Sequence, residues 1–278
     1  MEELAGRVAV VTGAASGIGR ALAERWAAEG MRLVMADIEK EALVEAAEAL
    51  RGQGSDVLAV PTDVSDGGQV DALAEAAHDA YGPVHLLCNN AGVGTGGPVA
   101  ELTTEDWQWV LGVNLWGVIH GLRAFLPGML ASGEEGHVVN TASMAGLLGV
   151  PWMAPYAASK YAVVGISECL YHELMPTRVG VSVLCPSWVN TNIYRSSRNR
   201  PAHLGGGRPE RERGPLTDAL AQLLATGMAP ETVADHVADA VRRRRFWVLT
   251  HSDMLPVVEA RAAAILAGGN PPPFVFPS

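Results

Sequence analysis

The sequence VAVVTGAASGIG occupies residues 8–19 and carries the signal that decides the fold. Its first five residues are apolar or β-branched, which is typical of a buried strand. Gly13, Gly17 and Gly19 follow at a spacing that lets the chain turn tightly out of a strand and into a helix. The backbone of such a turn can approach a pyrophosphate, whose charge then sits at the positive helix N-terminus. The stretch therefore predicts a dinucleotide site.

An acidic residue refines that prediction. Asp37 follows the next apolar segment, 18 residues after Gly19, close to where a ribose-binding carboxylate is expected. A carboxylate accepts hydrogen bonds from the ribose hydroxyls of NAD and repels the 2′-phosphate of NADP. Ser16 and Ile38 stand where an arginine or lysine would otherwise reach that phosphate. The residues favour NAD(H) as the cofactor.

Beyond this turn, short β-branched segments alternate with longer amphipathic ones. The pattern predicts strands at 8–12, 33–36, 57–60, 84–88, 137–141, 181–185 and 246–250. Helices are predicted at about 18–29, 41–51, 69–81, 104–130, 156–174 and 230–244. This is an α/β, Rossmann-like doubly wound fold, a seven-stranded parallel sheet with helices on both faces, in one domain over 1–278.

The amino-acid composition changes late in the chain. Residues 192–216 are rich in Arg, Ser, Gly and Pro and show no hydrophobic period. We expect a substrate lid here, an insertion reaching about residue 228, which is loose until ligands bind. Residues 251–278 form a short C-terminal extension.

A tyrosine and a lysine predict acid–base chemistry. Tyr156 and Lys160 are one helical turn apart and so share a helix face, where the ammonium is expected to lower the pKa of the phenol. Ser143 follows the strand ending at Thr141, at the edge of the sheet where ligands bind. Its hydroxyl can hold a substrate oxygen while Tyr156 gives or takes the proton.

Taken together, these motifs resemble those of the short-chain dehydrogenases/reductases in their shorter branch, over residues 5–250. The signature glycines lie at 13, 17 and 19, the adenine-contacting acid at Asp63-Val64, and the sheet-stabilising segment at 89–92. The catalytic tetrad of that family is matched by Asn114, Ser143, Tyr156 and Lys160.

The resemblance implies further roles. Lys160 would also hold the nicotinamide ribose, Asn114 would anchor a water in a proton relay, and Thr191 would contact the carboxamide. One departure is visible, because Ser187 follows Pro186 where the family usually has glycine. The full cofactor set is Gly13, Ser16, Gly17, Ile18, Gly19, Asp37, Asp63, Val64, Asn90, Ala91, Gly92, Tyr156, Lys160, Pro186, Val189 and Thr191.

The resemblance also suggests a homotetramer or dimer, built on the helices at 104–130 and 156–174. Apolar residues on more than one face of these helices support it, namely Trp107, Trp109, Leu170 and Tyr171.

Composition excludes several function classes. A formal charge of −10 argues against nucleic acid and anionic lipid as partners. The chain begins with acidic residues rather than a basic and then apolar leader, so we expect a cytoplasmic protein. No apolar stretch reaches the length of a membrane-spanning helix. The three cysteines, Cys88, Cys169 and Cys185, lie in apolar segments and are expected to be buried, reduced thiols.

Some features are assigned structural roles. The arginines at 242–245 are expected to complement a helix C-terminus. His78, His137 and His172 lack metal-ligand spacing, and no metal site is predicted.

The leading hypothesis is hydride transfer between NAD(H) and a ketone or secondary alcohol. One alternative is a catalytically silent nucleotide-binding scaffold or sensor, which would need no tetrad. Another is a sugar-nucleotide epimerase or dehydratase, for which the chain leaves little room. An apolar substrate of aromatic or alicyclic type is indicated by eight residues, Leu147, Leu148, Val150, Trp152, Met153, Trp188, Ile193 and Tyr194.

Overall fold

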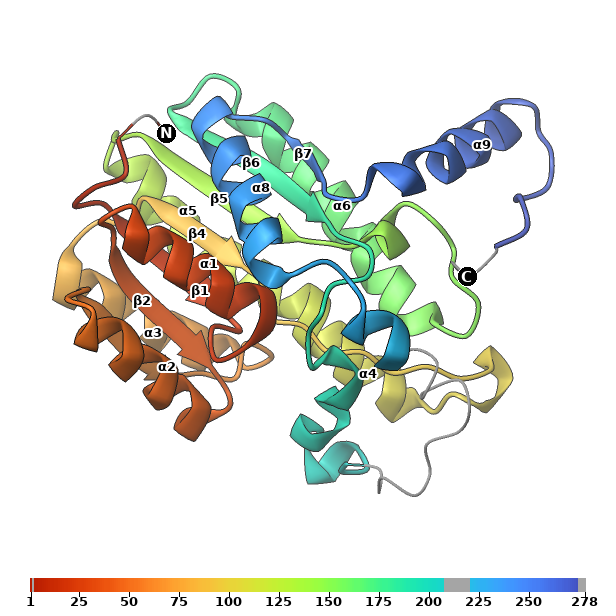
Figure 1. Cartoon of the computed structure of the whole chain (residues 1–278), viewed down its shortest axis with the longest axis horizontal. Helices are drawn as coiled ribbons and strands as arrows, with labels where there is room; N and C mark the ends of the chain where they lie inside the picture. The colour runs from red at the N-terminus through yellow and green to blue at the C-terminus, as the bar shows by residue number, and fades with distance from the viewer. Residues whose placement is uncertain (2, 208–220, 275–278) are drawn as a thin grey trace.

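Seven parallel strands form the centre of the molecule. The computed structural model describes residues 1, 3–207 and 221–274. In it the strand order is β3-β2-β1-β4-β5-β6-β7, and Figure 1 shows the twist of this sheet. The bounds are Val8–Thr12 for β1, Arg32–Asp37 for β2, Val57–Pro61 for β3, Leu86–Asn89 for β4, Gly136–Thr141 for β5, Val179–Cys185 for β6 and Trp247–Leu249 for β7. The predicted fold is confirmed.

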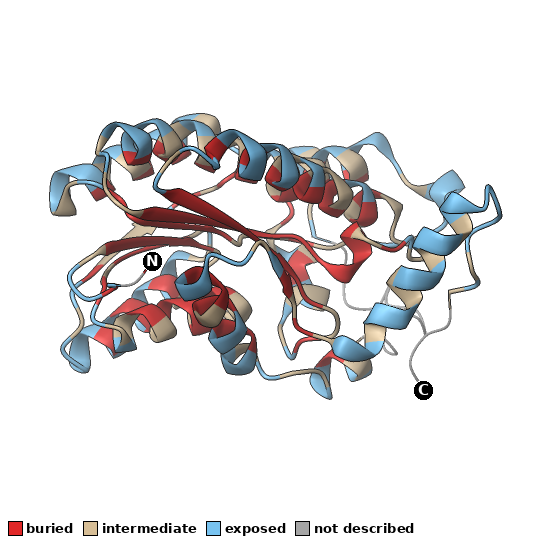
Figure 2. Ribbon diagram, turned by 90° about the horizontal axis from the view of Figure 1, so that it is seen from above, coloured by how far each residue is buried: buried red, intermediate tan, exposed pale blue. Residues whose placement is uncertain are grey.

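Helices cover both faces of the sheet, as Figure 2 shows. One layer contains α1 (Gly17–Ala28), α2 (Lys40–Gly52) and α8 (Pro230–Arg243). The other contains α3 (Gly67–Tyr81), α5 (Gly117–Ala131) and α6 (Ala154–Leu174). Strand order reverses between β1 and β4, so the loops after these strands diverge and leave a crevice at the carboxyl edge.

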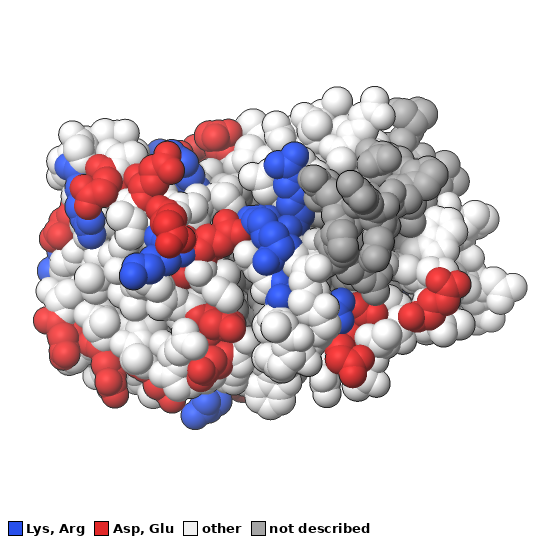
Figure 3. All heavy atoms as spheres, turned by 90° about the horizontal axis from the view of Figure 1, so that it is seen from below, with Lys and Arg blue, Asp and Glu red and all other residues white. Residues whose placement is uncertain are grey.

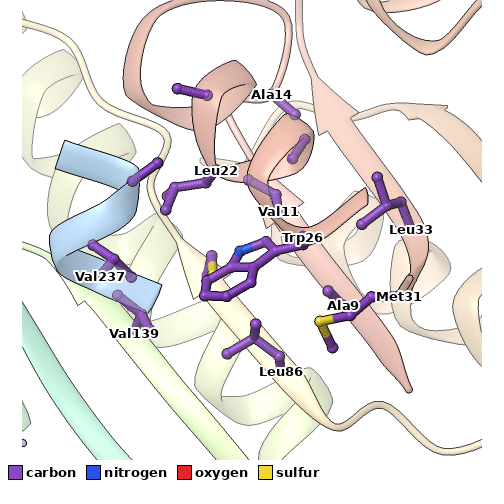
Figure 4. Close-up of a cluster of buried hydrophobic side chains, with 14 of the residues drawn as sticks. Ala9, Val11, Ala14, Leu22, Trp26, Met31, Leu33, Leu86, Val139 and Val237 are labelled. Atoms are coloured by element: carbon purple, nitrogen blue, oxygen red, sulfur yellow. The ribbon is translucent and has the colours of Figure 1, made fainter. Parts of the chain in front are cut away.

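A buried tryptophan is central to the first layer. Trp26 of α1 is fully buried and lies among Leu22, Leu86 and Val237 in Figure 4. Burying so large an apolar surface contributes about 2–3 kcal/mol. It fixes α1, and hence the glycine-rich turn before it, against the sheet.

Two predicted strands are shorter than expected. β4 begins at Leu86 rather than residue 84, because the N–H of Val8 donates to the ring of His85 at 3.1 Å instead of to a neighbouring carbonyl. β7 ends at Leu249 because Thr250 and His251 turn toward the loop after β6, where their side chains make hydrogen bonds.

The helix predicted at 104–130 has an interruption. It consists of α4 (Thr104–Leu111), a π-helical segment (Gly112–Trp116) and α5. The side chain of Asn114 in this segment bonds both the N–H and the carbonyl of Val93, which fixes the widened turn against the loop after β4. By length and apolar composition this helix could cross a membrane, but its inner side is packed on the sheet like that of a core helix.

One cysteine differs from expectation. Cys88 and Cys185 are buried, whereas Cys169 is exposed on the outer side of α6, so the prediction that it is buried was wrong. Its neighbours in sequence are apolar, but the helix turns this position away from the core. The arginines at 242–245 make surface ion pairs, among them Arg242 with Glu29 and Arg243 with Asp239.

The C-terminal extension includes a projecting helix. A short turn at Ser252–Met254 leads into α9 (Leu255–Leu266), which extends away from the sheet in Figures 1 and 2. Its first turns pack on the cluster under α6 through Val257 and Val258, while Leu266 is exposed.

A buried histidine predicts acid lability. Burial lowers the pKa of His137 to about 3, since the ring is enclosed under the sheet with Ser182 on Nε2. The unfolded chain gains this proton near pH 6.5. Between pH 6.5 and 3 the unfolded state binds more protons than the folded state. The free energy of unfolding should therefore decrease as the pH is lowered through this range, by up to about 5 kcal/mol. Urea unfolding at pH 7 and 5 should show this fall, and His137→Gln should reduce it; an equal fall in both proteins would contradict the assignment.

Candidate active site

A cavity of about 510 Å³ opens at the carboxyl edge of the sheet. It runs from the loop after β2 to the start of α6. Most of the predicted site residues line it, and two do not: Gly19 lies beneath the turn, and Asn114 lies one layer behind the wall. The lining members are Gly13, Ser16, Gly17, Ile18, Asp37, Asp63, Val64, Asn90, Ala91, Gly92, Ser143, Tyr156, Lys160, Pro186, Val189 and Thr191.

The glycine-rich turn has no room for side chains. Gly13 and Gly17 adopt positive φ values of 67° and 55°. A Cβ at Gly19 would lie 2.0 Å from the carbonyl oxygen of Gly13, so only glycine permits α1 to start this close to the turn. Gly17 and Ile18 at the start of α1 line the cavity, and backbone N–H groups in the first turn of a helix can donate to a pyrophosphate. The residues present therefore fit a dinucleotide.

Asp37 ends β2 with its carboxylate oriented by backbone donors. Oδ2 accepts from the N–H of Ala15 at 2.9 Å and Oδ1 from the N–H of Glu39 at 3.0 Å. Burial raises the pKa of Asp37, and these two bonds oppose that rise. Each oxygen retains a second lone pair for a ribose hydroxyl.

A cation that sequence reasoning missed lies beside this carboxylate. Nε of Arg198 donates to Oε1 of Glu39 at 2.5 Å, and Nδ2 of Asn199 donates to the same oxygen at 2.8 Å. Arg198 lowers the pKa of Glu39. The guanidinium is thus brought to the ribose end of the cavity and paired there. On the face in Figure 3, acidic side chains are widely spread, with basic ones beside them.

Asn90 and Thr12 hold three strand ends together. The N–H groups of Asn90 and Ala91 both donate to Oγ1 of Thr12, at 2.9 and 3.1 Å. The amide of Asn90 donates to the carbonyl of Thr12 at 3.0 Å and accepts from Thr141. These bonds fix the wall between the cofactor turn and the catalytic edge.

Ser143, Tyr156 and Lys160 converge at the far end of the cavity. Ser143 follows β5, and the first two turns of α6 carry Tyr156 and Lys160. The hydroxyl of Ser143 lies close enough to the phenol of Tyr156 to lower the pKa of that phenol. Nζ of Lys160 donates to the carbonyl of Thr141 at 2.8 Å and lies 5.6 Å from the centroid of the Tyr156 ring.

The pKa of the phenol differs from the expectation. Burial raises the pKa of Tyr156, and its bond with Ser143 lowers it only in part, so the predicted lowering by Lys160 was wrong for this geometry. The ammonium points to the carbonyl of Thr141 rather than to the phenol oxygen. Burial also lowers the pKa of Lys160 to about 8. At neutral pH the phenol therefore keeps a proton that it can donate.

Asn114 connects the catalytic helix to the loop after β4. Its amide nitrogen donates to Oγ of Ser159 at 3.1 Å and to the carbonyl of Val93 at 2.9 Å. Its oxygen accepts from the N–H of Val93 at 2.8 Å. The side chain is fully buried and so acts on the site from behind.

The loop after β6 forms the side of the cavity near Ser143. The N–H of Met144 donates to the carbonyl of Pro186 at 2.9 Å, and Thr191 contacts the Gly17 turn. The φ of Ser187 is not positive, so this residue occupies the loop without the strain of a left-handed backbone.

The substrate end is apolar. Seven of the eight residues expected there line the cavity, and Leu147 does not; it packs on the buried cluster of Val118 and Val163. Among described residues, the lining at this end holds no Lys, Arg, Asp or Glu apart from catalytic Lys160. Sequence reasoning missed five further apolar members that reach the cavity from distant segments, namely Trp109, Leu204, Leu224, Met254 and Phe274.

The described part of the proposed lid is anchored at three points, one of them being the pairing of Arg198 and Asn199 with Glu39. Ser196 is buried and bonds the backbone of Gly94, while Arg200 forms a buried ion pair with Asp106 of α4 at 2.5 Å. The segment forms short turns at Ile193–Asn199 and Ala202–Leu204. Residues 208–216 of the predicted lid lie outside the described residues.

Within residues 1, 3–207 and 221–274, no group of three His, Cys, Asp or Glu side chains could hold a metal ion.

Known proteins are similar to this chain in sequence and in fold. The family model for short chain dehydrogenase matches residues 7–202. A CLA biosynthesis dehydrogenase/reductase of Lactiplantibacillus plantarum is 33% identical, over 98% of this chain and 97% of its own. The 1-deoxy-11-beta-hydroxypentalenate dehydrogenase of Streptomyces exfoliatus is 38% identical, over 89% and 84%.

Two solved structures carry a nicotinamide cofactor. A short chain dehydrogenase/reductase from Burkholderia phymatum in complex with NAD is 46% identical, with a TM-score of 0.95, over 99% of this chain and 100% of its own. A variant of actinorhodin polyketide ketoreductase with NADPH is 34% identical, with a TM-score of 0.76, over 90% and 96%.

Proposed function

This chain belongs to the short-chain dehydrogenase/reductase family, and from that premise we propose that it interconverts a neutral, apolar ketone and its secondary alcohol with NAD(H). The observation that carries the proposal is the convergence of Ser143, Tyr156 and Lys160 in the cavity that also contains the glycine-rich turn. A nucleotide-binding scaffold needs the turn alone, so the silent alternative is not favoured.

The chain's own residues then have distinct tasks. The hydroxyl of Ser143 donates to the substrate oxygen and holds it next to Tyr156. Tyr156 gives its proton to that oxygen during reduction and takes it back during oxidation. Lys160, whose Nζ is oriented by the carbonyl of Thr141, would hold a ribose hydroxyl. NAD(H) supplies or accepts the hydride at C4 of its nicotinamide.

Asp37 supports NAD(H) rather than NADP(H). Its half-buried carboxylate lines the cavity, and Arg198 is paired with Glu39 instead of being free to meet a 2′-phosphate. Asp63 and Val64 would border the adenine. The relative with NAD bound agrees with this choice, and the ketoreductase with NADPH shows that the fold accepts either cofactor.

The apolar, tryptophan-rich end of the cavity supports an alicyclic or aromatic substrate. Trp109, Trp152 and Trp188 offer flat faces, and the charge of Arg200 is neutralised by Asp106 instead of being offered to a carboxylate. One relative is a 1-deoxy-11-beta-hydroxypentalenate dehydrogenase. We propose further that the segment at 192–228 closes over the substrate as a lid.

We also propose a homotetramer or dimer in the cytoplasm. Of the four residues that suggested an oligomer, Trp109 and Leu170 are buried within the subunit, whereas the side chain of Tyr171 is 37% exposed. Trp116 and Leu130 add exposed apolar surface on the α4–α5 side. Light scattering at micromolar concentration should give a multiple of the 29.2 kDa chain mass, and a monomer would contradict the proposal.

A substrate panel tests the proposed function. Cyclic and aromatic ketones, their alcohols and matched keto acids are assayed with NADH or NAD⁺ at the nicotinamide absorbance band. At least one neutral cyclic ketone should be reduced faster than every keto acid. Faster turnover of a keto acid would overturn the proposed substrate class.

A further inference from the structure

His251 connects the C-terminal extension to the loop that borders the nicotinamide end of the cavity. It follows β7 and lies outside the family match at 7–202. Its Nε2 is 3.0 Å from the carbonyl oxygen of Trp188. Its Nδ1 is 3.2 Å from the backbone nitrogen of Ser187 and 2.7 Å from Oγ1 of Thr250.

These partners determine the protonation of the ring. A carbonyl only accepts, so Nε2 must carry a proton, and a backbone N–H only donates, so Nδ1 must offer its lone pair to Ser187. The neutral Nε2–H tautomer is therefore the one that fits, with the hydroxyl of Thr250 sharing the Nδ1 side. One ring thus bonds two successive residues of the loop, one as acceptor and one as donor.

The same loop is attached on its other sides to the catalytic machinery. The carbonyl of Pro186 accepts from the N–H of Met144 at 2.9 Å and from Oγ of Ser143 at 3.4 Å. The carbonyl of Trp188 also accepts from the N–H of Met228 at 2.9 Å. A shift of the loop would therefore move the catalytic serine and the cavity wall together.

The position of the loop depends on His251 because the ring accepts a hydrogen bond from a backbone N–H of the loop. The N–H of Ser187 makes its hydrogen bond with the His251 ring. A partly buried N–H without a partner is unfavourable, so loss of the ring would favour a rearranged loop. Met254, three residues beyond His251, lines the cavity as well.

We propose that His251 is a positioning residue that fixes loop 186–190 for cofactor binding and for the alignment of Ser143. Through His251, the start of the C-terminal extension contributes to the active site. This inference rests on the proposed function for its kinetic readout, but not for its structural one.

The test compares His251→Leu with His251→Gln. Leucine removes the hydrogen bonds that the ring makes with Ser187 and Trp188, whereas the glutamine amide retains one donor and one acceptor. The dissociation constant for NADH, measured by nucleotide fluorescence, should rise about tenfold in His251→Leu and by less than about threefold in His251→Gln. The value of kcat should fall as well in the leucine variant. His172→Leu, on the exposed side of α6, is the control and should behave like the wild type.

Amide exchange of loop 186–190 provides a readout that needs no ligand. In His251→Leu the amides of Ser187 and Trp188 should lose protection, while those of β1 should not. A lower melting temperature with unchanged NADH affinity and unchanged loop protection would show a merely structural role and overturn the proposal. Should His251→Leu not fold, His251→Asn, which is too short to span both partners, replaces it under the same criteria.

The two proposals fail in distinguishable ways. If the wild type does not bind NADH, the proposed function is wrong, and loop exchange alone decides the role of His251. If the wild type binds NADH and His251→Leu binds it equally well with a protected loop, only the positioning role is wrong.

Discussion

Tyr156→Phe should lower kcat by about 10²–10⁴-fold, the usual contribution of an acid–base group. The substitution removes the phenolic proton while the ring, which is partly buried beside Lys160, keeps its packing. Because the raised pKa of Tyr156 keeps the proton on the phenol at neutral pH, reduction depends on this group as the donor. Single-turnover kinetics with a ketone identified in the panel measure the loss.

Cofactor affinity separates this loss from a folding defect. The dissociation constant for NADH should change by less than about threefold in Tyr156→Phe, since the aromatic ring remains. Tyr161→Phe, on the same helix but outside the cavity lining, is the matched control and should retain turnover. More than a tenth of the wild-type rate in Tyr156→Phe would exclude Tyr156 as the acid.

Replacement of Asp37 by Ala together with Ile38→Arg should reverse the cofactor preference. The change removes the carboxylate that repels a 2′-phosphate and supplies a guanidinium at a position that is already 46% exposed. The ratio of kcat/KM for NADPH to that for NADH should rise by about 100-fold or more, since both a repulsion and a missing partner are corrected.

Glu39→Gln gives a graded version of the same experiment. It releases Arg198 from its ion pair while Asp37 remains, so the ratio should rise by about tenfold. Glu41→Gln, exposed at the start of α2, is the control and should leave the ratio unchanged. A wild type that already uses NADPH as well as NADH would contradict the role assigned to Asp37.

The sequence predicts the fold and the catalytic end of the site because their signals are local. Gly13, Gly17 and Gly19 occupy a single strand–turn–helix unit, and Tyr156 and Lys160 are one helical turn apart. Such spacings constrain geometry whatever the rest of the chain does. The parallel alternation brings Ser143 to the same edge, whereas the order of the strands comes from the structure.

Other features depend on contacts between distant segments, which no local pattern encodes. Arg198 meets Glu39 across 159 positions, and His251 meets Ser187 across 64. The π-helical segment is not visible in the hydrophobic period of 104–130, because it results from the bond of Asn114 to the loop after β4. Leu147 and Leu148 have the same apolar character and both pack on the cluster of Val118 and Val163, yet only Leu148 also lines the cavity.

The most direct test of the central claim follows an isotope. The wild-type protein is incubated with NADH deuterated at C4, separately on each face, and with a cyclic ketone from the panel, and the alcohol is analysed by mass spectrometry. We expect deuterium on the carbinol carbon from one face of the cofactor only, and loss of that transfer in Tyr156→Phe. An alcohol without cofactor-derived deuterium would contradict direct hydride transfer in this site.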